Sequence, residues 1–320
     1  MKTLVLMASL AASASAQLPG IYTQVDRIVF VVPDVDKALA AWKASSAVEV
    51  FGKQTAEFEA EYRGRVSSSN VYFAAGRFGD VIANWMQPVS GTNAFSEFLK
   101  AHGPGVFALL HRVASPSDLD AEVARMKGLN VGVLQSGPMG DDDSRYVLFD
   151  TQPEGKYILG IYYQRESPPP PPASARKVTQ FAFIVRDEKP VAKYWAKLGW
   201  PDMSITQPDL NSLEYRGKPG DFKARLGWMR HGKVAYEWIM PEKGPSTWQD
   251  HLDKHGEGIH HLAFSVDDMD RAISDWKQSG FGVAMSGGWG EPGKKGSGRF
   301  AYIDTQSAGG LDIELLWNQR

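Results

Sequence analysis

A run of apolar residues that leads into an amphipathic helical segment recurs along the chain. The apolar runs read as strands and occupy Arg27–Val32, Phe181–Val185 and Ile259–Val266. An acidic residue after each run can cap the helix that comes next. The helices are expected over Val35–Ser45, Lys189–Leu198 and Met269–Gln278. Several short strand-like runs follow each helix, so the recurring unit is predicted to be βαβββ.

Alternation within these strands separates two faces. Gln180, Ala182 and Ile184 lie on one face, and Phe181, Phe183 and Val185 lie on the other. The larger apolar face is expected to meet the helix. In the later strand, the same alternation turns His261, and not His260, toward the opposite face.

The two halves of the chain are copies of one module. A shift of 153 residues places Phe183 on Phe30, Trp195 on Trp42, Trp238 on Trp85 and His255 on His102. The copies span Gln24–Tyr163 and Lys177–Trp317, and residues 164–176 between them contain the proline run Pro168–Pro172. Each module contains two βαβββ units. The predicted class is α+β, with mostly antiparallel open sheets and helices on one face.

The first residues resemble a secretory leader. Met1–Ala16 has Lys2 in a short charged start, an apolar run and small residues that end in Ala14-Ser15-Ala16. Cleavage after Ala16 and a secreted or periplasmic location are expected. No other segment approaches the length of a membrane span.

Composition limits the partners and the chemistry. The chain has 35 Lys and Arg against 37 Asp and Glu, which gives no basic footprint for nucleic acid. It has no cysteine, so a metal would be held by nitrogen and oxygen ligands. A small-molecule substrate is expected, with the protein a monomer or a homodimer.

One stretch of the second module resembles a known superfamily. Gly258–Asp270, which begins Gly-Ile-His-His-Leu-Ala-Phe, and the closing strand Leu311–Leu315 are similar to the vicinal oxygen chelate proteins. That superfamily includes glyoxalase I, methylmalonyl-CoA epimerase, extradiol dioxygenases and bleomycin-resistance proteins. The resemblance implies paired βαβββ units that form a cupped sheet, with metal ligands on the first and fourth strands of each unit.

Transferred to this chain, the ligand positions differ between the modules. The resemblance implies a divalent metal in the second module, held by Gln180, Glu237, His261 and Glu314. Zinc is the first candidate, with nickel, cobalt, manganese and iron as alternatives. The corresponding residues of the first module do not form a ligand set for a divalent cation, so it is expected to be metal-free: they are Arg27, Asn84, Ala108 and Gly160.

The units could pair in two ways. Pairing across the repeat would place His261 and Glu314 opposite Arg27 and Asn84 and leave half a site in each cup. Pairing within each module would keep all four donors together. The coherence of the four donors favours pairing within the module.

The Gln/Glu/His/Glu set resembles zinc-type glyoxalase I. The resemblance implies lyase or isomerase chemistry, glyoxalase-like or epimerase-like, through a metal-stabilised enediolate of a small oxygen-rich substrate. Glu314 is the candidate base, and Glu237 is the second candidate. The alternative is a non-catalytic protein that sequesters a ligand, as bleomycin-resistance proteins do.

The glycine-rich segment Ser286–Gly298 is expected at the rim of the cup. Its candidates for holding an anionic or aromatic substrate are Trp289, Lys294, Lys295 and Arg299. The alternative is a solvated loop without such a role. Arg299 also recurs as Arg145 in the first module, and a repeated position favours a structural role.

Overall fold

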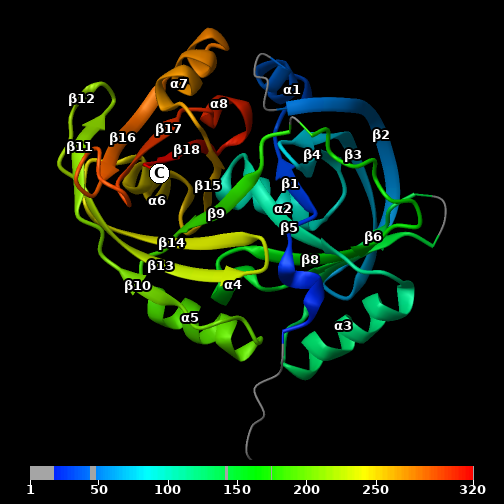
Figure 1. Ribbon diagram of the computed structural model, residues 1–320. Coiled ribbons are helices and arrows are strands. Elements are labelled where there is room, and N and C mark those ends of the chain that lie inside the picture. Colours follow the sequence, from blue (N-terminus) through cyan, green and yellow to red (C-terminus); the bar gives the residue numbers. More distant parts are fainter. Residues whose placement is uncertain (1–17, 44–47, 141–142, 174, 320) are drawn as a thin grey trace, which may run out of the picture.

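Figure 1 shows the computed structural model, which describes residues 18–43, 48–140, 143–173 and 175–319. The predicted leader Met1–Ala16 lies outside the described residues. Among the described residues, none of the helices combines the length and the apolar character needed to cross a membrane.

The first half of the chain forms a closed barrel of eight strands in the order β1-β4-β3-β2-β6-β7-β8-β5. A short 3-10 helix, η1 (Gly20–Thr23), precedes it. We call this half the first module; its elements are β1 (Arg27–Val31), α1 (Val35–Lys43), β2 (Val48–Tyr62), β3 (Arg65–Phe78), β4 (Val81–Ser90), α2 (Ala94–His102), β5 (Gly105–Arg112), α3 (Pro116–Gly128), β6 (Val133–Pro138), β7 (Arg145–Phe149), α4 (Gln152–Gly155) and β8 (Ile158–Tyr163).

The second half forms one ten-stranded sheet in the order β10-β13-β14-β9-β15-β18-β17-β16-β11-β12. We call this half the second module; its elements are β9 (Val178–Ile184), α5 (Glu188–Lys197), β10 (Ser204–Thr206), β11 (Leu210–Tyr215), β12 (Lys218–Pro219), β13 (Lys223–His231), β14 (Val234–Lys243), α6 (Thr247–His255), β15 (Gly258–Ser265), α7 (Met269–Gln278), β16 (Val283–Trp289), β17 (Gly298–Ile303), α8 (Gln306–Gly309) and β18 (Asp312–Asn318). The predicted α+β class with two tandem cupped modules is confirmed.

The first sheet is closed, which differs from the open sheet expected. The long strand β2 pairs along β3, and its end reaches β6, where Glu61 lies opposite Ser136. The corresponding stretch of the second module is split into β10 and β11, with Pro208 in the gap. A proline has no N–H to donate to a ladder, so it interrupts a strand. The break leaves β10 on β13 and β11 on β16.

Strand register is the same in the two modules. Val29 of β1 lies opposite Asn84 of β4 and Ala108 of β5, and Ala182 of β9 lies opposite Glu237 and His261. Within each module the first strand therefore pairs with the strand that opens the second βαβββ unit. Each cup is built from one half of the chain.

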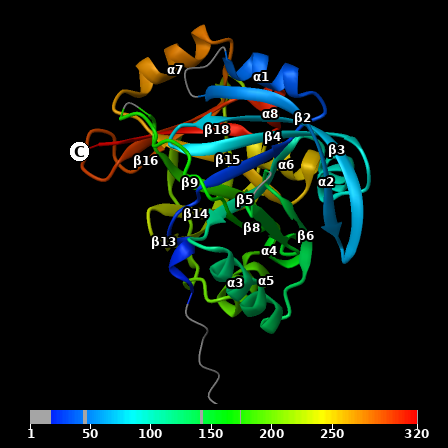
Figure 2. The same cartoon turned by 90° about the vertical axis from the view of Figure 1, so that its right-hand side faces the viewer.

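The helices pack between the modules in two groups. In both views, α1 lies near α7 at one end of the molecule and α3 lies near α5 at the other (Figures 1 and 2). The side chains of Trp42, Met126, Trp195 and Trp276, one from each of these helices, belong to a single apolar core that both modules share.

Contacts between the modules occur as equivalent pairs. The indole Nε1 of Trp195 donates to the Gly155 carbonyl at 3.1 Å, and Trp42 lies against Gly309 at the corresponding place. His102 and His255 each place Nδ1 near the other's carbonyl oxygen, at 3.2 and 2.7 Å. Residues that are equivalent in the two copies of the sequence thus make equivalent contacts across the interface between the modules.

Candidate metal centre

Four polar side chains from four strands converge inside the second cup. Gln180 comes from β9, Glu237 from β14, His261 from β15 and Glu314 from β18. Alternation along each strand turns these residues inward, while Phe181, Leu262 and Ile313 turn into the shared core. These are the four residues that the family resemblance implied as ligands.

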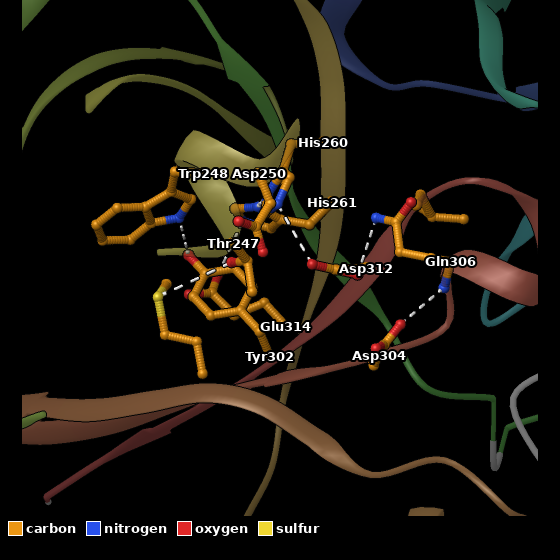
Figure 3. A network of polar contacts seen from close by, with 12 residues as sticks. Thr247, Trp248, Asp250, His260, His261, Tyr302, Asp304, Gln306, Asp312 and Glu314 are labelled. Carbon is orange, nitrogen blue, oxygen red and sulfur yellow. Dashed lines mark hydrogen bonds and ion pairs between the residues drawn. The ribbon is translucent and has the colours of Figure 1, made fainter. Parts of the chain in front are cut away.

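The donor atoms lie close together around His261. Its Nε2 is 3.2 Å from Glu314 Oε2 and 3.5 Å from Glu237 Oε2. The Gln180 amide donates to Glu237 and, at 3.3 Å, to Glu314. The ligand atoms of the His and the two Glu residues all lie within 4.8 Å of one another. Figure 3 shows His261 and Glu314 within the surrounding polar network.

The cluster is almost completely buried, and burial disfavours charge. Burial raises the pKa of Glu237, and the nearby Glu314 raises it further, although His261 works in the opposite direction. Burial alone would lower the pKa of His261, but the carboxylates Glu314 and Glu237 outweigh it and raise this pKa to about 9. The two buried carboxylates are thus stabilised by one positive group, the His261 imidazolium, that lies between them.

A second histidine orients His261. The Nδ1 atoms of His260 and His261 are 2.9 Å apart, and His260 Nε2 lies 3.3 Å from Asp312 Oδ2 (Figure 3). Burial lowers the pKa of His260, so it is neutral and carries one ring proton. With that proton on Nε2, toward Asp312, its Nδ1 accepts the Nδ1–H of His261. The Nε2 of His261 is then the atom that faces the carboxylates.

The network continues behind Asp312. The Gln306 amide donates to Asp312 Oδ1 at 3.0 Å, on the side away from His260. A histidine that ligates a metal is usually held through its other ring nitrogen, often by a carboxylate, and here His260 lies between His261 and the carboxylate of Asp312. The prediction that His260 faces away from His261 is wrong, because the strand register shifts between Ile259 and His261 and lets the two imidazoles meet. Asp312 was not singled out from the sequence, although it lies two residues before Glu314 on the same strand.

The cluster opens into a cavity of about 500 Å³. Gln180, Glu237 and Glu314 line its base, and aromatic side chains line its walls: Trp228, Trp248, Trp289, Phe300 and Tyr302. Burial, together with Glu314 and Glu237, raises the pKa of Tyr302 well above its usual value. Its hydroxyl therefore keeps its proton, and Trp248 Nε1 donates to its oxygen at 3.2 Å.

The residues expected to contact the substrate are not brought together. Trp289, at the end of β16, lines the cavity. Lys294 and Lys295 lie in the exposed turn between β16 and β17 and do not line it. Arg299 pairs with Asp270 of α7 at 2.8 Å, on the face of the sheet that α7 covers and away from the cavity. Its counterpart Arg145 pairs in the same way with Asp120 of α3.

One basic residue at this cavity was not among those expected. Arg230, on β13, lines the cavity, with its guanidinium 5.1 Å from the ring centre of Trp228. It also acts to lower the pKa of Glu237. A signal was available, because Trp228 and Arg230 alternate on one face of a strand and Trp228 lies opposite Glu237 in the ladder.

The donor set fits a divalent cation. One imidazole nitrogen, two carboxylates and an amide are nitrogen and oxygen ligands that borderline metals accept. Gln180 presents its carbonyl oxygen to the same point by a half-turn of its terminal amide. A cation there would relieve the repulsion between Glu237 and Glu314, which is otherwise relieved by protons.

These features define a protein of two cupped-sheet modules with a buried carboxylate–histidine centre in one of them. Residues 26–149 and 179–302 both match the Glyoxalase/Bleomycin resistance protein/Dioxygenase superfamily. The chain therefore belongs to this superfamily, the vicinal oxygen chelate proteins, through two fused modules.

Solved structures of the same architecture differ widely in sequence. A triple mutant of 4-hydroxymandelate synthase from Streptomyces coelicolor is 14% identical, covers 92% of each chain and has a TM-score of 0.60. The Mn(II)-bound glyoxalase from Novosphingobium aromaticivorans is 17% identical, covers 93% of this chain and 83% of that one, and has a TM-score of 0.53.

A halotolerant catechol dioxygenase is 12% identical, covers 92% of this chain and 87% of that one, and has a TM-score of 0.51. Among curated proteins, none matches this chain in sequence. At these identities, the structural likeness establishes the fold alone.

Proposed function

We propose that the second module is a metal-dependent enzyme that performs lyase or isomerase chemistry on a small oxygen-rich substrate. The observation that carries the proposal is the buried convergence of Gln180, Glu237, His261 and Glu314 at the base of a cavity. A divalent metal held by these residues would polarise neighbouring oxygens of the substrate. The glyoxalase resemblance of the ligand set supports this class of reaction.

Glu314 is the proposed general base. It lines the cavity beside Glu237, and the proton it takes would come from the substrate carbon next to a polarised oxygen. Tyr302 lies opposite Glu314 in the β17–β18 ladder and keeps its hydroxyl proton. Tyr302 can therefore donate a hydrogen bond to negative charge that develops in the cavity.

The cavity walls favour a substrate that is both planar and anionic. Trp228 and Trp289 offer aromatic faces, and Arg230 offers a guanidinium at the same cavity. A guanidinium binds a carboxylate or phosphate through parallel hydrogen bonds. We include Arg230 in the proposed substrate site and leave out Lys294, Lys295 and Arg299, which lie away from the cavity.

The proposal also includes export. Met1–Ala16 has the three regions of a secretory leader in order. A secreted or periplasmic location agrees with the absence of cysteine from the whole chain, because no thiol would be exposed to oxidation.

Metal content is the decisive measurement. Elemental analysis of the purified protein should find about one equivalent of a divalent metal, and His261→Ala and the double variant Glu237→Ala/Glu314→Ala should lose it. His111→Ala is the matched control, because His111 is equally buried but packs against Tyr22 of the shared core. A wild-type protein that stays metal-free after reconstitution overturns the proposal.

Turnover separates an enzyme from a binding protein. Glu314→Gln should lower turnover of hemithioacetal or α-keto substrates by about a hundredfold or more while ligand affinity is kept. Glu122→Gln, which changes a buried glutamate of α3, should leave turnover unchanged. A metal-loaded protein that binds such compounds tightly and turns none of them over would instead be a sequestering protein.

A further inference from the structure

The first cup contains a cavity larger than the one in the second cup. Its volume is about 750 Å³, which is within the range that encloses drug-sized molecules. The walls are strongly apolar and carry five phenylalanine side chains: Phe51, Phe58, Phe73, Phe95 and Phe107. An apolar space of this size suits a large apolar body.

A buried positive charge lies in this cavity. Arg27 is 6% exposed, and the described residues place no carboxylate within ion-pair distance of it. Its guanidinium donates to Asn84 Oδ1 at 2.7 Å and Gln164 Oε1 at 2.9 Å, and it lies 4.7 Å from the ring centre of Tyr162. All three partners are neutral. A buried guanidinium without a negative partner is costly, since the lost hydration is not replaced.

Two hydrogen-bond donors at this place have no acceptor. Within the described part of the chain, neither the Nε–H of Arg27 nor the side-chain amide nitrogen of Asn84 has a hydrogen-bond partner. Both residues line the cavity. Unpaired donors next to a positive charge are the complement of a carboxylate, which only accepts hydrogen bonds.

Neighbouring acidic groups do not take this role. The charge of Asp26 interacts with that of Arg27, but its carboxylate accepts hydrogen bonds from the Arg112 backbone N–H and from Gln24, and it forms no ion pair with Arg27. The two carboxylates that line the cavity, Glu57 and Glu166, belong to exposed residues. Because both residues are exposed, water screens their repulsion of an anion.

The equivalent positions of the two modules carry different chemistry. Arg27 has the place of Gln180, and Ala108 and Gly160 have the places of His261 and Glu314. A Cβ on Gly160 would lie 2.9 Å from Leu148 and 3.0 Å from Leu110, so apolar side chains occupy the region that a glutamate would need. A fixed cation has replaced the metal ligands.

We propose that the first cup is a separate binding site for a monocarboxylate with a large apolar body, whose carboxylate pairs with Arg27. The segment 164–169, which we call the strap, also contributes to this site, because residues 164 and 166–169 line the cavity and Gln164 bonds to the same guanidinium. Arg112 holds the strap through the Gln164 carbonyl and Ser167 Oγ, and Arg77 holds it through the Pro169 carbonyl. The site does not depend on the chemistry of the second cup.

Calorimetric titration of the full chain tests this site. The reagents are 2-naphthoate and decanoate, each compared with its neutral amide, 2-naphthamide or decanamide. Both acids should bind at least about tenfold more tightly than their amides, because only the acids form charge-assisted hydrogen bonds. The better acid distinguishes an aromatic from an aliphatic natural ligand.

Variants locate the binding. Arg27→Met should reduce the preference for acid over amide to about one and leave amide affinity within about threefold. Arg230→Met, which removes the guanidinium of the other cavity, should change neither. Ala75→Leu fills the first cavity and keeps Arg27, so acid and amide should weaken together, and this variant stays informative if Arg27→Met fails to fold.

Three results would overturn the proposal. The acids could fail to bind at millimolar concentration, the preference could survive in Arg27→Met, or it could be lost in Arg230→Met alone. The last result would place the bound acid in the second cup. None of these outcomes depends on metal content, so this site and the proposed enzyme can fail separately.

Discussion

At the base of each cup lies a residue from the first strand of its module, Arg27 in one and Gln180 in the other. Both residues are buried, and both occupy the same register against the neighbouring strands. Around Gln180 there are two carboxylates and a histidine, while the side chains that accept hydrogen bonds from Arg27 are both neutral amides. The same scaffold thus holds negative charge in one cup and positive charge in the other.

The difference shows that the backbone fold determines where the inward positions lie, whereas the side chains at those positions determine the charge of the cup. The ladder fixes four inward positions in each cup, and it does so regardless of which residues occupy them. The charge at those positions decides whether the cup attracts a cation or an anion. Exchange of single residues between the cups therefore tests both assignments.

The largest effect is expected when the second cup receives the residue of the first. Gln180→Arg places a guanidinium beside Glu237 and Glu314, which neutralises them and blocks the ligand position. Metal affinity should fall by more than about a hundredfold, measured by competition with a chelator. The reciprocal change Arg27→Gln is the control and should leave metal affinity unaltered. Unchanged metal binding in Gln180→Arg would exclude Gln180 as a ligand.

The next effect concerns the histidine that orients the centre. Asp312→Asn replaces the carboxylate beside His260 with a neutral amide, so the Nε2 proton of His260 is held less firmly. His260 then orients His261 less well, and metal affinity should fall about 10- to 100-fold. Asp304→Asn is the matched control, since Asp304 lies in the same network (Figure 3) but its side chain is 44% exposed and contacts neither histidine. Equal effects of the two variants would contradict a specific role for Asp312.

Much of the fold could be predicted from the sequence, because the repeat and the alternation of apolar and polar residues can both be read directly along the chain. The helix Met269–Gln278 was predicted with the bounds that the structure has, and the inward turn of His261 followed from alternation. Alternation failed for His260, because the strand register shifts between Ile259 and His261. The same rule applied to Arg299 would have placed it outside, because Phe300 and Tyr302 line the cavity on alternate positions of that strand.

Other features depend on contacts that no local pattern reports. The closure of the first barrel needs the end of β2 to meet β6, far along the chain. The metal set itself came from the family resemblance, since Gln180 and Glu237 have no informative spacing. From the sequence, Arg27 was interpreted only as a residue that cannot ligate a metal. The cavity around it is the observation on which the proposed carboxylate site rests.

A smaller effect compares the two equivalent contacts between the modules. A Cβ on Gly155 would lie 2.6 Å from a ring carbon of Trp195, whereas on Gly309 it would lie 3.4 Å from Trp42 Nε1. Gly155→Ala should lower the free energy of unfolding by about 1–3 kcal/mol because the indole must move. Gly309→Ala should cost clearly less, and urea unfolding of both variants measures the difference. Equal losses would show that the two contacts are equally tight.

The smallest effect is the contribution of one buried histidine of the first module, His111, to the pH dependence of stability. Burial, with a smaller contribution from His231, lowers the pKa of His111 to about 4. Its unfolded value is about 6.5, so below that pH the unfolded state binds the extra proton and stability falls as pH decreases toward 4. Between pH 7 and 5.5 the loss should be about 1 kcal/mol.

The variant His111→Phe tests this assignment, because the second module has Phe264 at the equivalent position. The variant loses the hydrogen bond to the Gln24 carbonyl, so its stability at pH 7 should be lower. Its additional loss between pH 7 and 5.5 should be smaller than in the wild type, as measured by urea unfolding at both values. An unchanged pH slope would assign the acid sensitivity to another group.

The chain segment that joins the modules has a consequence for symmetry. Two identical subunits in a symmetric dimer must carry the same residue at both copies of a position. Residues 164–176 make the two copies parts of one molecule, so position 27 and position 180 can differ while the shared core and its paired contacts stay alike. Covalent fusion therefore gives every molecule one cup with the Arg27 guanidinium and one cup with the carboxylate–histidine cluster, in a fixed one-to-one ratio.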